Sequence, residues 1–303
     1  MHRVELFFTG GFLMIRYEGD IYRPPSEANS LLIQATIGCS WNRCSFCALY
    51  GAKNFRIRSL DEIFSDLEWA RRHYRRIEKI FLCDGDALCL STSILTEIFR
   101  RIKNLFPECR SISVYGNARD VLSKGPEDLK QLANEGLGMV YIGAESGSDE
   151  VLASVNKGST AEDMITSIRL LEDSGIKASV TFISGLGGTA LAREHAVSCG
   201  QVVTESAPSY FSLLTLVLLP QMPLYSKLKS GEFTPLSTSG IIEETSIFFE
   251  NINLPERIES LTEPGVYRIP SCVFRSNHVS NAFPLRGTFP EDREALIKTL
   301  KMY

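Results

Sequence analysis

Short apolar segments alternate with segments of helical spacing over most of the chain. The apolar segments are rich in Ile, Val, Leu and Phe, which is typical of buried strands. We predict strands at residues 30–37, 79–83, 111–115, 139–143, 178–183 and 210–217. Between them, apolar residues recur every three or four positions, which predicts helices at residues 60–74, 93–106, 127–135, 160–174 and 190–204.

Strands and helices that alternate in this way predict right-handed parallel crossovers. Such crossovers build either a doubly wound open sheet or a (β/α) barrel, whole or partial. After about Tyr225 the alternation gives way to a weakly helical segment and loop-rich sequence. We therefore predict an N-terminal extension at residues 1–29, an α/β core at 30–225, and a loop-rich and helical C-terminal extension at 226–303 that closes the barrel.

Glycines and polar residues follow the predicted strands. In both architectures, ligands bind at these carboxyl ends of the strands, so this placement is expected of residues that contact a ligand. The segments are Gly38–Cys47 after the first strand, Asp84-Gly85-Asp86 after the second, Gly116-Asn117 after the third, Glu145-Ser146-Gly147 after the fourth, and Ser184–Gly188 after the fifth.

Three of the eight cysteines, Cys39, Cys44 and Cys47, are crowded into one segment with the spacing C-x4-C-x2-C. Crowded cysteines in such a chain indicate a metal site in a reducing compartment rather than disulfides. Three thiolates can hold one side of a cubane iron–sulfur cluster, and no fourth cysteine lies nearby. The spacing predicts a redox-active cluster with one iron open to a small ligand.

Two plainer interpretations of these cysteines stay open. A structural zinc site would need a fourth ligand, and the nearest histidine, His73, lies in a predicted helix. The thiols could also pack as small apolar side chains. The spacing favours the cluster over both.

This segment, with Phe46 directly before the last cysteine, resembles the cluster motif of the radical S-adenosylmethionine (radical SAM) superfamily. Most members have C-x3-C-x2-C, so the extra residue between Cys39 and Cys44 departs from the family pattern. The resemblance covers residues 22–225. It implies a partial (β/α)6 barrel of the TIM type, a [4Fe–4S] cluster on the three cysteines, and S-adenosylmethionine at the open iron.

The resemblance also implies cofactor contacts for the segments after the later strands. Glycines let the backbone approach a ligand closely, and a carboxylate suits two vicinal ribose hydroxyls. Taken alone, each segment also fits an ordinary turn, a helix N-terminal charge or a loop. The implied contacts are Asp84, Gly85 and Asp86 to the methionyl amino group, Glu145 and Ser146 to the ribose, and Phe46, Ser184, Gly185 and Leu186 to adenine.

Four polar residues are candidates for catalysis. Tyr115 and Asn117 lie at the end of the third predicted strand and could face a substrate, with an ordinary Asn turn as the alternative. Asn277 and His278 lie in a polar C-terminal loop that could close the open side of the barrel, with turn capping as the alternative. His195, inside a predicted helix, is expected to have a surface or packing role.

Composition narrows the function further. The 303 residues are 44% hydrophobic with a formal net charge of −4, which gives no overall positive field for a nucleic-acid backbone. The basic run at residues 71–76 ends a predicted helix, where positive charge offsets the helix dipole. No segment has the apolar run of a signal peptide or a membrane span. We expect a cytoplasmic, oxygen-sensitive protein that does not bind a membrane, and the composition gives no support for binding to nucleic acid.

The sequence therefore predicts a radical SAM enzyme. By the resemblance, it cleaves S-adenosylmethionine reductively to a 5′-deoxyadenosyl radical, which abstracts hydrogen from a small metabolite or cofactor precursor. A flavodoxin- or ferredoxin-type protein is the expected electron donor. Radical modification of tRNA or of a peptide is the alternative within enzymes, and a non-catalytic iron–sulfur electron carrier or sensor is the alternative outside them.

Overall fold

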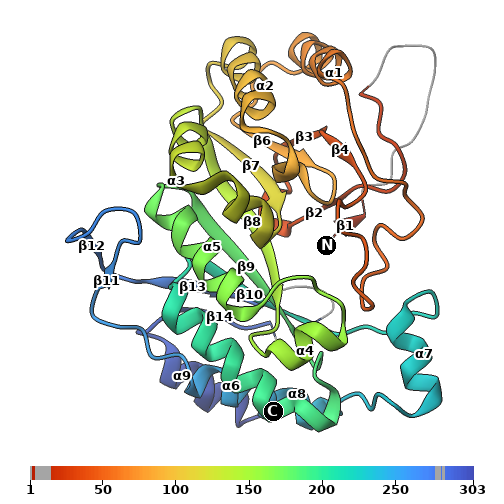
Figure 1. Ribbon diagram of the computed structural model, residues 1–303, viewed down its shortest axis with the longest axis vertical. Coiled ribbons are helices and arrows are strands. Elements are labelled where there is room, and N and C mark those ends of the chain that lie inside the picture. The colour runs from red at the N-terminus through yellow and green to blue at the C-terminus, as the bar shows by residue number, and fades with distance from the viewer. Residues whose placement is uncertain (1, 4–14, 277–280, 282–283) are drawn as a thin grey trace. The chain divides into compact units, whose positions relative to one another are not determined.

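The computed structural model describes residues 2–3, 15–276, 281 and 284–303 (Figure 1). The chain divides into two compact units. The first consists of Met1–Asn42, Leu49–Tyr141 and Ser174–Ile176, and the second of Arg43–Ala48, Ile142–Asp173 and Lys177–Tyr303. The division into extensions and core at residues 29/30 and 225/226 stays a prediction.

The main sheet is largely parallel. Its strands are β3 (Leu31–Gln34), β6 (Lys79–Cys83), β7 (Ser111–Gly116), β8 (Leu137–Glu145), β9 (Lys177–Ser184), β10 (Tyr210–Thr215), β13 (Cys272–Arg275) and β14 (Arg286–Phe289). Hydrogen bonds order them β14-β13-β10-β9-β8-β7-β6-β3. The predicted strands from the second to the sixth agree with β6 to β10 to within two residues at each end.

The first predicted strand, residues 30–37, is broken into two pieces. After β3, the short β4 (Thr36–Ile37) turns to pair antiparallel with β5 (Arg56–Ile57). Two other short antiparallel pairs are β1 (His2–Arg3) with β2 (Tyr22–Arg23), and β11 (Ile258–Glu259) with β12 (Tyr267–Arg268).

All five predicted helices are present. The helices are α1 (Leu60–His73), α2 (Thr92–Leu105), α3 (Ala118–Asn134), α4 (Asp149–Ser154), α5 (Ala161–Asp173), α6 (Gly188–Ser206), α7 (Pro223–Ser230), α8 (Thr238–Glu250) and α9 (Arg293–Leu300), with 3-10 turns at Pro25–Glu27 and Ala87–Cys89. At the start of α1, Ser59 Oγ accepts from Glu62 N, while Glu62 Oε2 accepts from Ser59 N. Gly125, with φ 69°, kinks α3 before Pro126, so the predicted helix is only its second half.

In the first unit, β3, β6 and β7 are parallel neighbours, with α1 packed on α2 and α2 on α3. One face of these strands carries an aromatic cluster. The ring of Phe81 lies 4.9 Å from that of Tyr115 and 5.8 Å from that of Tyr141, centroid to centroid. The predicted catalytic residue Tyr115 therefore packs among other rings.

In the second unit, β9, β10 and β13 are parallel, and β14 is antiparallel to β13. Helix α6 packs on α8, and α8 on α9. The C-terminal segment thus adds β13 and β14 to the main sheet, which the sequence does not predict because four-residue strands give too short a pattern to recognise. The weakly helical segment predicted there is α8. The core of the second unit contains a group of packed aromatic rings, from Phe182, Phe211, Phe248, Phe249, Phe274 and Phe289.

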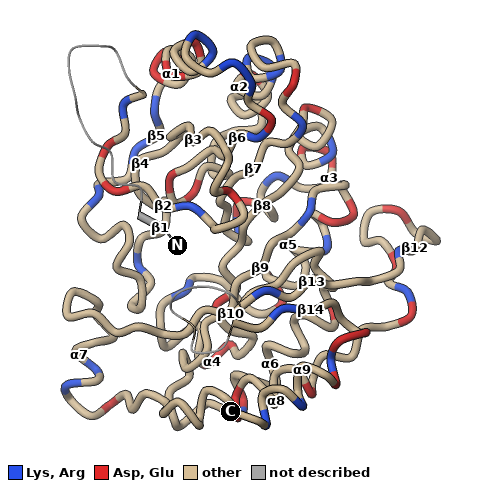
Figure 2. Tube along the Cα trace, turned by 180° about the vertical axis from the view of Figure 1, so that it is seen from behind, with Lys and Arg blue, Asp and Glu red and all other residues tan. Residues whose placement is uncertain are grey.

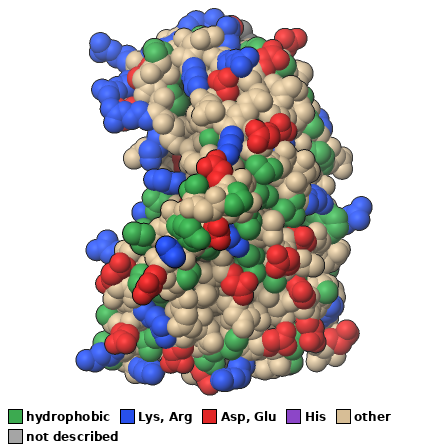
Figure 3. All heavy atoms as spheres, turned by 60° about the vertical axis from the view of Figure 1, so that its left-hand side comes forward, with side chains coloured by type: hydrophobic (Ala, Val, Ile, Leu, Met, Phe, Trp, Pro, Cys, Tyr) green, Lys and Arg blue, Asp and Glu red, His purple; other side chains and the backbone are tan. Residues whose placement is uncertain are grey.

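Basic residues gather on α1 and α2 (Figure 2). Many of them are paired, as Arg71 is with Glu108 at 2.7 Å and Arg101 is with Glu68. Over most of the face drawn in Figure 3, acidic and basic side chains are interspersed, with Lys and Arg concentrated at its upper edge. No helix in the described part of the chain combines the length and hydropathy needed to cross a bilayer.

Candidate functional site

In the first unit, Asp84 fixes the turn after β6. Its side chain is fully buried. Its Oδ2 accepts hydrogen bonds from Gly38 N at 3.0 Å, Lys53 Nζ at 2.6 Å and Gln34 Nε2 at 3.4 Å. The turn is thereby tied to the residue that precedes Cys39.

Asp86 connects the same turn to the cysteine segment and to α3. Its Oδ2 accepts from Ser40 Oγ, and from Asn117 Nδ2 at 2.8 Å. Arg119 donates to Ser40 Oγ at 2.8 Å and places its guanidinium over the ring of Trp41, 4.9 Å from the centroid. The predicted catalytic residue Asn117 is therefore held by Asp86.

Burial raises the pKa of Asp86 to about 7, and the nearby Asp120 carboxylate acts in the same direction. The hydrogen bonds from Ser40 and Asn117 oppose this shift. Oδ1 of Asp86 is buried and has no hydrogen-bond partner among the described residues, and the same is true of Oδ1 of Asp84. Both carboxylates thus keep one oxygen for a ligand or a proton.

Gly85 lies directly against Cys39. A Cβ atom on Gly85 would be 3.0 Å from Cys39 Cβ and 2.6 Å from Cε2 of Tyr50, so a larger residue does not fit. The structure therefore brings the turn after β6 beside the first cysteine. The extra residue of the cysteine segment is accommodated nearby, where Asn42 adopts φ 44° and donates to Tyr50 O at 3.0 Å.

In the second unit, Cys44 and Cys47 border an apolar cluster that contains Phe46 and Leu186. Backbone hydrogen bonds fix this segment, since Ser45 N donates to Val155 O and Ser45 O accepts from Leu224 N, both at 2.9 Å. Phe46 and Leu186, which the resemblance assigns to adenine, therefore belong to one cluster with two of the three cysteines.

Glu145 ends β8 in a left-handed conformation, with φ 67°. Its Oε1 accepts from Lys157 Nζ at 3.1 Å. The side chain of Glu145 is 13% exposed and that of Lys157 is 7% exposed. A Cβ on Gly143 would lie 1.9 Å from Glu145 Oε1, so only glycine leaves room for this carboxylate. Lys157 lies 12 residues downstream, and no sequence motif marks it.

Buried polar side chains form hydrogen bonds to Ser146 and to Gly185. Ser146 Oγ lies 2.8 Å from His195 Nδ1, and Gly185 N donates to Glu244 Oε1 at 2.7 Å. His195 is buried in α6, so the surface position that was one of its two expected roles is wrong. Glu244 lies in α8, and the sequence gives no indication of its role. Ser184 is buried at the end of β9.

Asn277 and His278, the two remaining catalytic candidates, lie outside the described residues. The neighbouring Asn281 has a structural role, because its Oδ1 accepts from Thr215 N at 2.8 Å and its Nδ2 donates to Leu213 O at 2.7 Å. It closes the end of β10.

The cysteine chemistry fits a cluster on the three-cysteine segment. None of the eight cysteines forms a disulfide, and Cys39, Cys44 and Cys47 are partly exposed. Cys83 and Cys199 are fully or almost fully buried, and burial raises the pKa of both thiols, which keeps them protonated. Within either unit, the described residues hold no group of three or more His, Cys, Asp or Glu side chains that could bind a metal ion.

A largely parallel sheet with buried polar turns at the carboxyl ends of its strands gives the chain an α/β fold of the barrel class. The model of the radical SAM superfamily matches residues 33–197, which is more than half of the chain. The chain therefore belongs to the radical SAM superfamily, and it is a radical SAM enzyme with a [4Fe–4S] cluster and S-adenosylmethionine as cofactors.

Two curated relatives illustrate the similarity in sequence. A putative methylthiotransferase of Methanocaldococcus jannaschii is 26% identical over 169 residues, which are 54% of this chain and 37% of that protein. A tRNA uridine(34) acetyltransferase of Methanocaldococcus infernus is 26% identical over 122 residues, which are 40% of this chain and 23% of that protein. The chain thus spans well under half the length of these relatives.

Two solved structures show the same fold. Coproporphyrinogen III oxidase of Escherichia coli, a radical SAM enzyme, has a TM-score of 0.57 at 19% identity, over 74% of this chain and 52% of that chain. A radical SAM methyltransferase of Kitasatospora setae, solved with tryptophan and a SAM analogue, has a TM-score of 0.56 at 23% identity, over 68% and 39% of the two chains. The predicted partial barrel is confirmed.

Proposed function

We propose that Cys39, Cys44 and Cys47 hold the cluster, and that this enzyme abstracts hydrogen from a small metabolite or cofactor precursor. The observation that carries the proposal is the apolar cluster that joins Phe46 and Leu186 to Cys44 and Cys47. Held by these three cysteines, the cluster would supply the one-electron reduction that cleaves S-adenosylmethionine to methionine and the 5′-deoxyadenosyl radical of the proposed hydrogen abstraction. A flavodoxin- or ferredoxin-type protein delivers that electron.

The turn after β6 binds the methionyl end of S-adenosylmethionine in this proposal. Gly85 lets this turn pack directly against Cys39 and the Tyr50 ring, where a side chain would collide. The free Oδ1 oxygens of Asp84 and Asp86 are acceptors for an ammonium group, and Lys53 holds Asp84 in place at 2.6 Å. The methionyl amino group thus has buried acceptors close to the first cysteine.

The turns after β8 and β9 bind the nucleoside end. Glu145 is a carboxylate acceptor for the ribose hydroxyls, and Lys157 fixes its orientation. Ser146 adds a second polar group at the same turn. Phe46 and Leu186 enclose the adenine ring with apolar surface, while Ser184 and Gly185 shape the backbone beside it.

A small substrate is favoured by the charge of the protein. The formal net charge is −4, and many basic residues of α1 and α2 are paired with carboxylates. Our candidates for substrate contacts remain Tyr115, Asn117, Asn277 and His278.

The second candidate function is tRNA modification, which the similarity to a tRNA uridine(34) acetyltransferase supports. A gel-shift titration with bulk tRNA distinguishes the two, since retarded tRNA at low micromolar protein would favour the second.

The proposal is tested by anaerobic reconstitution of the protein with iron and sulfide. Incubation with dithionite and S-adenosylmethionine should yield 5′-deoxyadenosine and methionine in equal amounts, with faster release when the correct metabolite fraction is added. Changing Cys39, Cys44 and Cys47 together to Ala should remove the iron and the product. Cys109→Ser is the matched control, because Cys109 is partly exposed but lies apart from the segment. Iron and product retained in the triple variant would refute the ligand assignment.

A further inference from the structure

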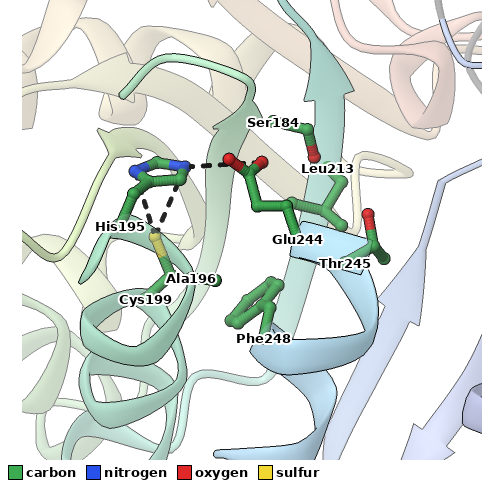
Figure 4. Close-up of a pocket in the computed structure, with 8 residues that line it drawn as sticks. All are labelled: Ser184, His195, Ala196, Cys199, Leu213, Glu244, Thr245 and Phe248. Atoms are coloured by element: carbon green, nitrogen blue, oxygen red, sulfur yellow. Dashed lines mark hydrogen bonds and ion pairs between the residues drawn. The ribbon is translucent and has the colours of Figure 1, made fainter. Parts of the chain in front are cut away.

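A buried polar layer lies behind the turns after β8 and β9 in the second unit. It consists of His195 on α6 and Glu244 on α8, which face each other across a small pocket (Figure 4). Both side chains are only 3% exposed, and His195 Nε2 lies 4.0 Å from Glu244 Oε1. Neither residue belongs to a turn that contacts a cofactor in the proposed function.

His195 connects the two turns. Its Nδ1 lies 2.8 Å from Ser146 Oγ, which itself accepts from Ser148 N at 3.0 Å. The imidazole is also hydrogen-bonded to the backbone of Ile183, near the end of β9. A hydroxyl can accept from Ser148 N and share a second hydrogen bond with Nδ1 of His195 at the same time. One neutral imidazole thereby fixes the turn after β8 relative to the end of β9.

Glu244 holds the second of these turns. Its Oε1 accepts from Gly185 N at 2.7 Å, and Gly185 has φ +83°. Its Oε2 is buried without a hydrogen-bond partner among the described residues. A side chain from α8 therefore fixes the backbone at Gly185, in addition to the backbone hydrogen bond from Leu216 N to Ser184 O at 3.0 Å.

We infer that His195 and Glu244 are positioning residues for S-adenosylmethionine, which set the turns of Ser146 and Gly185 at the spacing that ribose and adenine require. The inference rests on the proposed function, in which these turns bind the nucleoside. It assigns to α8 a part in cofactor binding that no cysteine or strand motif indicates. The two residues act through the backbone and through Ser146, without touching the cofactor.

Protonation supports this role. Burial lowers the pKa of His195 to about 4 and raises the pKa of Glu244 to about 8, so both are mainly neutral at pH 7. The titratable groups that face Glu244 are His195 and Cys199, both from α6, and no cation lies against it in the described part of the chain. Above pH 8 an ionised Glu244 would be a buried charge without a compensating partner, which favours loosening of the layer.

The pH dependence of cofactor binding tests the inference. The dissociation constant for S-adenosylmethionine is measured on the reconstituted protein by anaerobic calorimetry between pH 6.5 and 9. If binding needs the neutral acid, the affinity of wild-type protein should fall about tenfold between pH 7 and pH 9. Glu244→Gln keeps an acceptor for Gly185 N without a titrating group, so this additional loss at high pH should be absent.

Two further variants complete the experiment. Glu244→Leu removes the acceptor for Gly185 N, so its dissociation constant should rise about tenfold at pH 7 while its iron content stays normal, and Glu244→Gln should rescue it. Glu243→Gln, at an exposed neighbouring position, is the control and should match wild type. The inference is overturned if the dissociation constant of Glu244→Gln for S-adenosylmethionine depends on pH as that of wild type does. This result is decisive even if Glu244→Leu does not fold. Absence of 5′-deoxyadenosine from wild-type protein would instead refute the proposed function.

Discussion

Lys157 Nζ donates to Glu145 Oε1 at 3.1 Å, with 7% and 13% of the two side chains exposed. The pair lies at the end of β8, where we place the ribose. A buried carboxylate is stable only when a partner balances its charge. Lys157 therefore stabilises the fold and fixes the position of the Glu145 carboxylate at this turn.

We expect Lys157→Met to lower the free energy of unfolding by about 3 kcal/mol, since it leaves the Glu145 charge buried without this partner. Anaerobic urea unfolding measures the change. The double variant Glu145→Gln/Lys157→Met should recover part of the loss, because it removes the uncompensated charge. Lys177→Met, at an exposed position, is the control. Equal losses in the single and double variants would contradict this account.

Gly85→Ala should disrupt the site at the first cysteine. The new Cβ would lie 2.6 Å from Cε2 of Tyr50 and 3.0 Å from Cys39 Cβ, so either the cysteine segment or the Tyr50 ring must move. We expect a lower iron content per protein and little 5′-deoxyadenosine. Iron analysis and product assay after identical reconstitution give the answer.

Gly51→Ala is the matched control for this change, because a Cβ on Gly51 meets no atom within 4 Å. Tyr50→Leu should partly rescue Gly85→Ala, since it removes the ring atoms in conflict. If Gly85→Ala keeps the iron content and product yield of Gly51→Ala, the close approach to Cys39 has no functional importance.

The sequence predicts the parts of this site that depend on neighbouring residues. The spacing of Cys39, Cys44 and Cys47 is local, and so is the placement of Gly85 directly after a strand. The alternation of apolar segments locates β6 to β10 because buried parallel strands are almost continuously apolar. Elements that arise from local pattern are therefore recovered.

Contacts between distant positions are not recovered in this way. Glu244 meets Gly185 from 59 residues further along the chain, and nothing near Glu244 distinguishes it from an exposed glutamate of an amphipathic helix. The break between β3 and β4 escapes prediction as well, since residues 30–37 read as one apolar run. Packing decides these features, and a single sequence carries no direct record of packing.

The stability of the protein should fall as the pH rises from about 4 to 7, in part because of Asp86. Its pKa is about 7 in the folded protein, above the usual value of 3.8, so the folded state binds more protons than the unfolded state in this range. Asp86→Asn should flatten this part of the profile and be more stable than wild type at pH 8. Urea unfolding at pH 5 and pH 8 provides the test.

Asp61→Asn serves as the control for this profile, because Asp61 is exposed in the first turn of α1. Its dependence on pH should follow that of wild type. If the free energy of unfolding of Asp86→Asn falls with pH as steeply as that of wild type, Asp86 does not cause the fall and is ionised throughout this range in wild-type protein. Its buried Oδ1 would then be available to an ammonium group at every pH.

Phe46→Ala should weaken the binding of S-adenosylmethionine without weakening that of methionine. The ring shares an apolar cluster with Leu186, and loss of aromatic stacking on a base weakens binding by about 1–3 kcal/mol, or roughly 5- to 150-fold. Methionine lacks the adenine ring and, in our assignment, contacts the open iron and the turn after β6, so its affinity should stay within about twofold, a difference under 0.5 kcal/mol. Anaerobic calorimetry with each ligand measures both constants, and Phe55→Ala, at a ring that is 40% exposed, is the control. Equal weakening of both ligands would show that Phe46 supports the cysteine segment rather than adenine, because a displaced cluster affects every ligand of its open iron.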